Sequence, residues 1–243
     1  MNKSYIWISV LAVLTAFAGG FLLANALNKK ELFNLKTENE RLKSASPTSE
    51  DSQERELSDE EIKQKIAEAD KNPDNFAFQK SLGIGLYRYA TIKQNPGLLL
   101  EVERILNRAY QLNPKDQEVL VFYGNTVFDV GFAKKENAKF ELARKLYSQA
   151  LVQQPKDVDI QTDLGLTYFY ENPPQDEKAI PELQKSLAIN PDHERSLQYL
   201  AQIYARKNDQ AEMEKYLSKL KQINPQNQFI KELQTPLSEK TNQ

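Results

Sequence analysis

The sequence contains no cysteine and a single histidine, His193. The absence of cysteine excludes disulfides, thiolate metal sites, cysteine nucleophiles and a lipid-modified N-terminal cysteine. One histidine also rules out a histidine-rich metal site. Glycine is scarce, at 8 of 243 residues, which disfavours an all-β fold rich in tight turns. The sequence therefore predicts a protein with no metal site and no cofactor.

The sequence also lacks an excess of charge of either sign, because 32 Lys and Arg nearly balance 34 Asp and Glu and the net charge is −2. The chain therefore has no overall positive charge that would attract nucleic acid. No nucleophile–base constellation is visible. Acidic pairs such as Asp59-Glu60 suit the start of a helix, and His193, after Pro191-Asp192, is expected to be exposed in a first helical turn. We expect neither an enzyme nor a nucleic-acid-binding protein.

An uncharged run follows the short N-terminal tail at 1–4 and covers residues 5–27. As a helix it would be about 34 Å long, against roughly 30 Å for the hydrocarbon core of a bilayer. Tyr5 and Trp7 lie at one end, where amphipathic rings favour the membrane interface. The alternative is a signal peptide cleaved at Ala24-Asn25-Ala26, but its apolar core is typically 7–15 residues. We expect an uncleaved transmembrane helix over 5–27.

Two features of the N-terminal region bear on self-association. Small residues recur every four positions in the apolar run and can let two membrane helices approach closely; they are Ala12, Ala16, Gly20 and Ala24. Segment 28–43 has leucines at heptad spacing, with Asn39 at a core position that can fix register in a two-stranded coil. A homodimer through anchor and stalk is one interpretation. The other is that Ala and Gly are common in membrane helices and that 28–43 is a solvated helical stalk.

Residues 44–57 are polar and contain almost no apolar side chain, so they cannot bury a core. We interpret them as a disordered linker. Ser58-Asp59-Glu60-Glu61 then has the pattern of a capping box and predicts a helix over 58–72.

Proline recurs after Asn or Gln at intervals of 41, 41, 36 and 34 residues, and each one follows an amphipathic segment that it would end as a helix. These dipeptides are Asn72-Pro73, Asn113-Pro114, Gln154-Pro155, Asn190-Pro191 and Asn224-Pro225. Ten residues after each of the first four prolines stands a small residue: Gly83, Gly124, Gly165 and Ala201. Small or apolar residues recur at helical spacing before the next proline, as in Ala143, Tyr147 and Ala150.

This combination resembles the tetratricopeptide repeat (TPR) family, over roughly Phe76 to Pro225. The resemblance implies an all-α solenoid of helix-turn-helix repeats, in which small residues let paired helices cross closely. The solenoid would cover 58–233, with a leading helix at 58–72 and repeats at about 76–116, 117–157, 158–193 and 194–227. A capping helix at 228–233 would cover the end of the core with Phe229, before a disordered tail at 234–243. The first two intervals exceed the family's 34 residues by seven, which predicts longer turns or longer helices there.

The TPR resemblance also implies a concave groove, lined by the first helix of each repeat, that takes a helix or an extended peptide. Tyr87, Phe128 and Phe169 occupy equivalent positions and would form an aromatic ladder in it, unless they pack between neighbouring repeats. The candidate groove residues are Lys80, Tyr87, Arg88, Asn125, Phe128, Phe169, Tyr170, Arg195, Gln198 and Gln202.

Some family members clamp a C-terminal carboxylate with lysine, asparagine and arginine. Here Asn125 and Arg195 match, but Val121 replaces the lysine and Asp163 the second asparagine. An aspartate would repel a carboxylate, so we expect no clamp of this kind.

The leading functional hypothesis is a membrane-anchored scaffold or assembly factor that binds a protein or peptide in the groove. One alternative is an accessory subunit of a periplasmic enzyme or maturation complex, because the layout resembles the anchored bacterial TPR subunits of cytochrome c biogenesis. A second is a self-associating structural spacer. Lys29 and Lys30 after the apolar run favour cytoplasmic repeats by charge count, whereas large domains translocate largely regardless of charge. We favour the extracytoplasmic, periplasmic side and keep the cytoplasmic side as the alternative.

Overall fold

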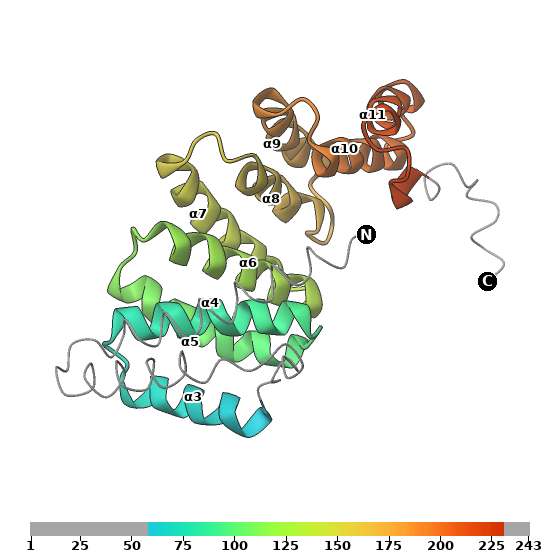
Figure 1. Ribbon diagram of the computed structural model, residues 1–243. Coiled ribbons are helices and arrows are strands. Elements are labelled where there is room, and N and C mark those ends of the chain that lie inside the picture. Colours follow the sequence, from blue (N-terminus) through green and yellow to red (C-terminus); the bar gives the residue numbers. More distant parts are fainter. Residues whose placement is uncertain (1–57, 231–243) are drawn as a thin grey trace, which may run out of the picture. The chain divides into compact units, whose positions relative to one another are not determined.

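The computed structural model describes residues 58–230, and regular structure there is entirely helical (Figure 1). The elements are α3 (Asp59–Lys71), α4 (Phe76–Ile92), the 3₁₀ helix η1 (Pro96–Leu98), α5 (Leu99–Leu112), α6 (Gln117–Lys134), α7 (Asn137–Gln153), α8 (Val158–Phe169), α9 (Asp176–Ile189), α10 (Glu194–Arg206) and α11 (Gln210–Ile223). No helix among residues 58–230 is long and apolar enough to cross a membrane. The predictions for the anchor with its small-residue stripe, the stalk, the linker and the C-terminal tail lie outside the described residues.

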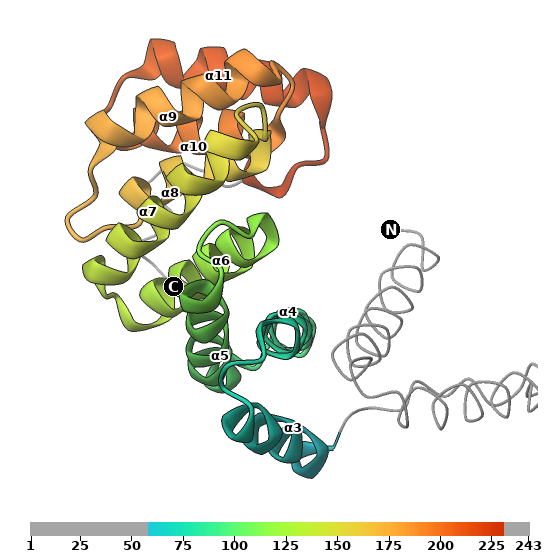
Figure 2. The same ribbon diagram turned by 90° about the vertical axis from the view of Figure 1, so that its left-hand side faces the viewer.

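The chain divides into two compact units, Met1–Thr126 and Val127–Gln243, and the division falls inside α6. In unit 1 the described elements are α3, α4, η1, α5 and the start of α6. In unit 2 they are the end of α6 and helices α7 to α11. Within each unit, consecutive helices lie side by side in both ribbon views (Figures 1 and 2), as expected for helical pairs that bury their apolar stripes against neighbours.

Small residues allow close crossing of paired helices in both units, as the sequence predicted. A Cβ atom placed on Gly83 of α4 would lie 2.6 Å from Leu106 Cδ2 of α5. A Cβ on Gly165 of α8 would lie 3.0 Å from Leu183 Cγ of α9. Leu106 and Leu183 are both fully buried. The close approach of the partner helix therefore leaves no room for a side chain at either position.

The extra residues of the first two repeats lengthen their helices. Helices α4, α6 and α7 have 17, 18 and 17 residues, against 12 in α8 and 13 in α10. The first repeat also adds η1 between its two helices. The third repeat has its extra residues in the turn after α8, where Asn137 holds Asn172: its Nδ2 donates to the Asn172 carbonyl at 2.9 Å, and its Oδ1 accepts from the Asn172 N–H at 3.0 Å.

Helix α3 has a polar side where the later second helices are apolar. In α5, the residues 12, 8 and 5 positions before the closing proline are fully buried; they are Val102, Leu106 and Ala109. The same positions of α3 hold Glu61, Lys65 and Glu68. Lys65 Nζ pairs with Glu68 Oε2 at 3.0 Å, and Glu61 accepts the Ser58 N–H at 2.9 Å in the predicted capping box. Helix α3 thus carries charged side chains at positions where α5 carries buried apolar ones.

Polar contacts attach α3 to the first repeat. Gln79 Nε2 of α4 donates to the carbonyls of Ala69 at 2.7 Å and Asn72 at 2.9 Å. Asp70 of α3 accepts from both Arg104 and Arg108 of α5, and these hydrogen bonds lower the pKa of the Asp70 carboxyl. The leading helix predicted over 58–72 is therefore part of unit 1.

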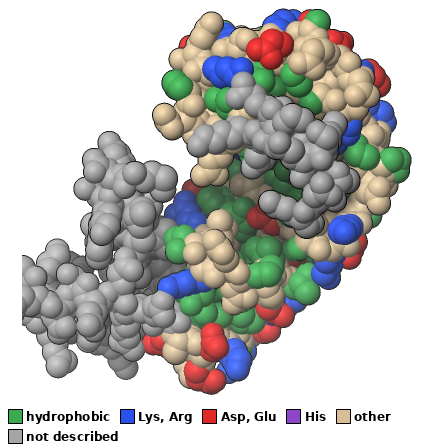
Figure 3. Space-filling view, turned by 90° about the vertical axis from the view of Figure 1, so that its right-hand side faces the viewer, with side chains coloured by type: hydrophobic (Ala, Val, Ile, Leu, Met, Phe, Trp, Pro, Cys, Tyr) green, Lys and Arg blue, Asp and Glu red, His purple; other side chains and the backbone are tan. Residues whose placement is uncertain are grey.

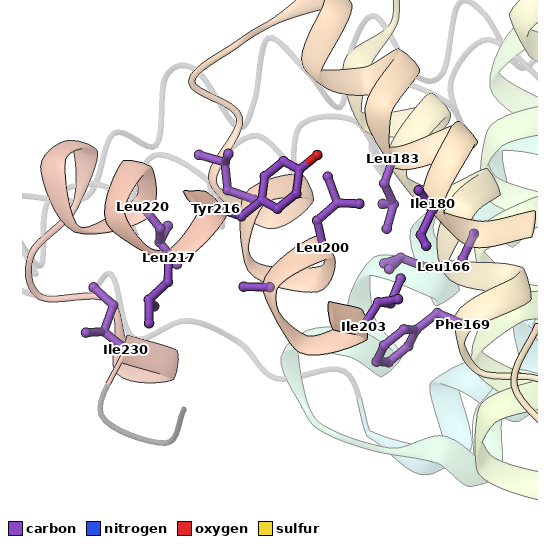
Figure 4. Close-up of a cluster of buried hydrophobic side chains, with 13 residues drawn as sticks. Leu166, Phe169, Ile180, Leu183, Leu200, Ile203, Tyr216, Leu217, Leu220 and Ile230 are labelled. Carbon is purple, nitrogen blue, oxygen red and sulfur yellow. The ribbon is translucent and has the colours of Figure 1, made fainter. Parts of the chain in front are cut away.

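The core of unit 2 is a continuous hydrophobic cluster that runs from α8 to the segment after α11 (Figure 4). At its C-terminal end Ile230 is 7% exposed and lies beside Leu217 and Leu220. Phe229, which was expected to cover this end, is partly buried, whereas its neighbour Ile230 belongs to the buried cluster. Ile230 stands five residues after its proline, the position at which earlier first helices bury Phe78, Val119 and Ile160.

In three of the four repeats, a residue with left-handed backbone conformation follows the first helix. One of these residues, Lys135, offers a test of the fold. Gln94, Lys135 and Asn208 have φ of 51°, 57° and 59°. Because a Cβ is unfavourable in this conformation, Lys135→Gly is expected to raise the free energy of unfolding by about 0.5 kcal/mol. Urea denaturation measures it. Lys145→Gly, on the exposed side of α7, is the control and should cost about 1 kcal/mol; a loss at both positions would contradict the assignment.

Candidate protein-binding surfaces

The predicted groove residues of unit 1 lie on α4 and the start of α6. The Tyr87 ring meets Phe122 of α6 edge-on, with centroids 5.7 Å apart. The Arg88 guanidinium lies over the same Phe122 ring, 5.1 Å from its centroid. Sequence reasoning missed Phe122, although its position one turn from Asn125 on a first helix was a signal. Tyr87, Arg88 and Phe122 form a small aromatic–cationic surface, and half-buried Asn125 lies on the same helix as Phe122.

Lys80 is the predicted cation of this surface, and its charge is already balanced. Its Nζ lies 2.9 Å from Asp116 Oδ2 and 2.6 Å from Glu118 Oε2. Burial lowers the pKa of Lys80, but the hydrogen bonds to Glu118 and Asp116 outweigh it and leave the pKa raised. Lys80 is therefore poorly placed to recruit a partner's carboxylate.

Unit 2 contains a contiguous cluster of rings, which we call the aromatic patch: Phe128, Phe132, Phe169, Tyr170 and Tyr199. Tyr170 is its centre, with ring centroids 5.8 Å from Phe128, 5.0 Å from Phe132, 4.9 Å from Phe169 and 6.0 Å from Tyr199. All four contacts are edge-to-face, the arrangement that aromatic quadrupoles favour. Tyr170 thus connects Phe128 to Phe169, two members of the predicted ladder, whereas Tyr87 belongs to unit 1.

Exposure differs sharply within the aromatic patch. Phe132 is 56% exposed, whereas Phe169 is 9% exposed because Tyr199 and the Arg206 guanidinium cover its ring at 5.0 and 4.6 Å. The Tyr170 and Tyr199 hydroxyls lie 2.8 Å apart. Burial, followed by this hydrogen bond, raises the pKa of Tyr170. The accessible part of the patch therefore centres on Phe132, near the end of α6.

The space-filling view shows that hydrophobic side chains reach the surface among charged ones (Figure 3). Among the described residues, five large hydrophobic side chains are exposed: Ile92, Leu100, Leu112, Phe132 and Val152. Single exposed apolar residues are ordinary on protein surfaces. Phe132 differs from the others because its ring contacts that of Tyr170, the residue that follows α8.

Arg195 lies on α10, where the sequence placed a possible carboxylate-binding cation. Its Nη2 lies 2.6 Å from Asp163 Oδ1 of α8. Burial raises the pKa of Asp163, although Arg195 opposes that shift. Arg195 is therefore already paired, and Asp163 beside it would repel an anion.

Two glutamines of α10 complete the predicted set. Gln198 is 9% exposed. Gln202 lies one turn further along, and its Nε2 is buried with no hydrogen-bond acceptor among the described residues. A buried amide without a hydrogen bond lowers the free energy of unfolding by roughly 1–3 kcal/mol.

His193 is not the exposed residue that the sequence suggested. Its side chain is 13% exposed, and its Nε2 lies 3.2 Å from Asp159 Oδ1. Its Nδ1 lies 2.9 Å from Ser196 Oγ and 3.2 Å from Thr162 Oγ1. The reason is a buried hydroxyl cluster of Thr162, Ser186 and Ser196, which needs polar partners from α8, α9 and α10.

The order Asp159–His193–Ser196 has the connectivity of a catalytic triad but not its accessibility. Ser196 is completely buried and hydrogen-bonds Thr162 at 2.9 Å and Ser186 at 2.9 Å. A nucleophile needs room for a substrate carbonyl beside its oxygen. These residues therefore fix the start of α10 against α8 and α9.

No protein-family model and no curated protein matches the sequence. Solved structures do match. A protein named YrrB, described as a TPR protein with an unusual peptide-binding site, is 15% identical with a TM-score of 0.56, over 71% of this chain and 83% of its own. A structure of MamA is 22% identical with a TM-score of 0.55, over 68% and 87%. MamA from Desulfovibrio magneticus RS-1 is 17% identical with a TM-score of 0.50, over 71% and 99%. At these identities the likeness shows a shared fold.

Proposed function

From its tetratricopeptide-repeat fold, we propose that this chain is a protein-interaction scaffold, and that the aromatic patch of unit 2 binds a helix or peptide of a partner. The observation that carries the proposal is that Phe132 is 56% exposed although its ring packs edge-on against Tyr170. A partner side chain placed there would bury Phe132 on a surface whose remaining rings are already fixed by their neighbours.

The energetics support this use of the patch. Aromatic side chains dominate binding energy when they lie in well-packed surroundings. Tyr170 and Tyr199 are held by their mutual hydrogen bond of 2.8 Å, so little side-chain entropy would be lost on binding. The similar structure described as peptide-binding is a TPR protein, which supports a binding role for this fold.

We further propose that residues 5–27 hold the scaffold in a membrane, with the repeats on the extracytoplasmic side. The support is the 23-residue uncharged run with Tyr5 and Trp7 at one end. A reporter fused after Gln243 that is active only outside the cytoplasm would test the orientation. Activity of a cytoplasm-only reporter at the same place would overturn it.

Site-specific photocrosslinking tests the binding patch in the intact chain. A benzoylphenylalanine at position 132 is expected to capture a discrete protein partner in the native host. The matched control replaces Val152, which is 82% exposed on α7 outside the patch. The patch would be excluded as a binding site if adducts at 132 were absent or identical to those at 152.

The companion variant is Phe132→Ala. Because the side chain is 56% exposed, its removal should change the free energy of unfolding by less than about 1 kcal/mol. Loss of a partner contact of hot-spot strength would weaken binding at least tenfold. Unchanged affinity for the crosslinked partner would contradict the proposal.

A further inference from the structure

Arg88 of α4 differs from every other arginine in the described part of the chain, because no carboxylate there pairs with it. Residues 58–230 contain six arginines. Five of them bind an acidic side chain: Arg104 and Arg108 bind Asp70, and Arg144, Arg195 and Arg206 bind Glu171, Asp163 and Asp176. The Arg88 guanidinium instead lies over the Phe122 ring of α6. Arg88 is partly buried, so its charge has lost part of its water without gaining an anion.

Two aromatic rings fix the position of the Arg88 guanidinium. It lies 5.1 Å from the centroid of Phe122, and the Tyr87 ring meets the same Phe122 ring at 75° with centroids 5.7 Å apart. A guanidinium that lies over a ring keeps N–H donors at its edge, in a fork that matches the two oxygens of a carboxylate. Because the contact with Phe122 already orders the side chain, an anion that binds there costs little further side-chain entropy.

The charges along α4 favour a single carboxylate over a phosphate group. Lys80, about 12 Å earlier along the axis of α4, is shared by Asp116 and Glu118 at 2.9 and 2.6 Å, and Glu118 is 59% exposed. These three side chains therefore carry a net negative charge and provide no second cation. A phosphate group of charge about −1.5 to −2 is typically bound by a cluster of arginines, whereas one guanidinium balances one carboxylate.

We propose that Arg88 anchors a second binding site, on α4 and α6 of unit 1, which takes one aspartate or glutamate side chain of a partner peptide. The carboxylate forms a bidentate ion pair with the Arg88 guanidinium, and neighbouring apolar residues of the peptide contact the partly exposed rings of Tyr87 and Phe122. Glu118 repels any further acidic residue placed toward the start of α6. This inference rests on Arg88 and not on the exposure of Phe132, so either proposal can fail alone.

Peptide selection on the full chain tests the site without a known partner. The probes are random dodecapeptides displayed on phage, and the dissociation constants of the selected sequences are measured as synthetic peptides by fluorescence anisotropy. We expect selected peptides with one acidic residue that bind the Arg88→Gln variant at least tenfold more weakly. Lys63→Gln is the matched control, because it removes an exposed positive charge from α3 of the same unit, and it should change the affinity less than twofold.

Changes in the peptide separate an ion pair from an effect on folding. Replacing its acidic residue with the corresponding amide should weaken binding to the parent chain at least tenfold and binding to Arg88→Gln less than twofold, because both changes remove the same interaction. Arg88→Lys keeps the charge without the fork, so its affinity should lie between those of the parent and Arg88→Gln. Selection of no peptide that depends on Arg88, or additive losses from the two changes, would overturn the proposal. Tighter binding of a phosphoserine peptide than of its aspartate counterpart would overturn it as well, since the site would then be built for phosphate.

Discussion

Replacing Gly83 with valine is expected to lower the free energy of unfolding of unit 1 by about 2–3 kcal/mol. A Cβ at this position would lie 2.6 Å from Leu106 Cδ2 and 3.3 Å from Ile105 Cγ2. Both α5 side chains are fully buried, so no free volume receives the added methyl groups. Urea denaturation followed by far-UV circular dichroism measures the loss.

Two further variants separate overpacking from a general intolerance of substitution. Leu106→Ala alone should cost about 2–5 kcal/mol through its cavity, and combined with Gly83→Val it should cost at least about 1 kcal/mol less than the sum, because the valine fills part of that cavity. Gly97→Ala in η1 is the matched glycine control, since its nearest neighbour is the Asn95 side chain at 3.3 Å. Strict additivity, or an equal loss at Gly97, would show that close helix crossing is not what requires Gly83.

The repeat register was predictable because its signals are local. Each Asn-Pro or Gln-Pro ends a helix through the chemistry of proline itself, and a small residue ten positions later marks the crossing. Applying that register to α3 shows that Glu61, Lys65 and Glu68 stand where α5 buries apolar side chains.

The candidate surfaces were predictable only in part, because exposure depends on the next helix along. Tyr87, Phe128 and Phe169 are equivalent in register, yet Phe169 is 9% exposed since Tyr199 and Arg206 cover it. Phe132, beyond the family's pattern at the end of a lengthened α6, is 56% exposed. Periodicity places a residue on a side of a helix but does not show which neighbour covers it.

The ion-pair partners of Lys80 and Arg195 could not be predicted from the sequence for a related reason. Lys80 meets Asp116, 36 positions away, and Arg195 meets Asp163, 32 positions away. These separations are about one repeat, so the partners become neighbours only when repeats stack. His193 behaves in the same way, because its partners Asp159 and Thr162 lie one repeat earlier on α8.

The largest electrostatic effect is expected at the buried pair Arg144–Glu171. Glu171 is 3% exposed and the Arg144 side chain 14%. The Arg144 guanidinium donates to Glu171 and to Thr167 Oγ1 at 3.3 Å, and lies 4.3 Å from the centre of the Tyr168 ring. Arg144→Met would leave a buried carboxylate without its cation, so the free energy of unfolding should fall by about 3–5 kcal/mol.

The double variant Arg144→Met with Glu171→Leu provides the decisive comparison. Because it removes both charges, it is expected to recover most of the loss, to within about 1 kcal/mol of the parent. Lys215→Met is the matched exposed control: Lys215 pairs with Glu212 at 2.8 Å but is 61% exposed, so its loss should stay below about 1 kcal/mol. If Arg144→Met cost no more than Lys215→Met, the pair would contribute no more than a surface contact. The link between α7 and the segment after α8 would then have to rest on Asn137 and Asn172 instead.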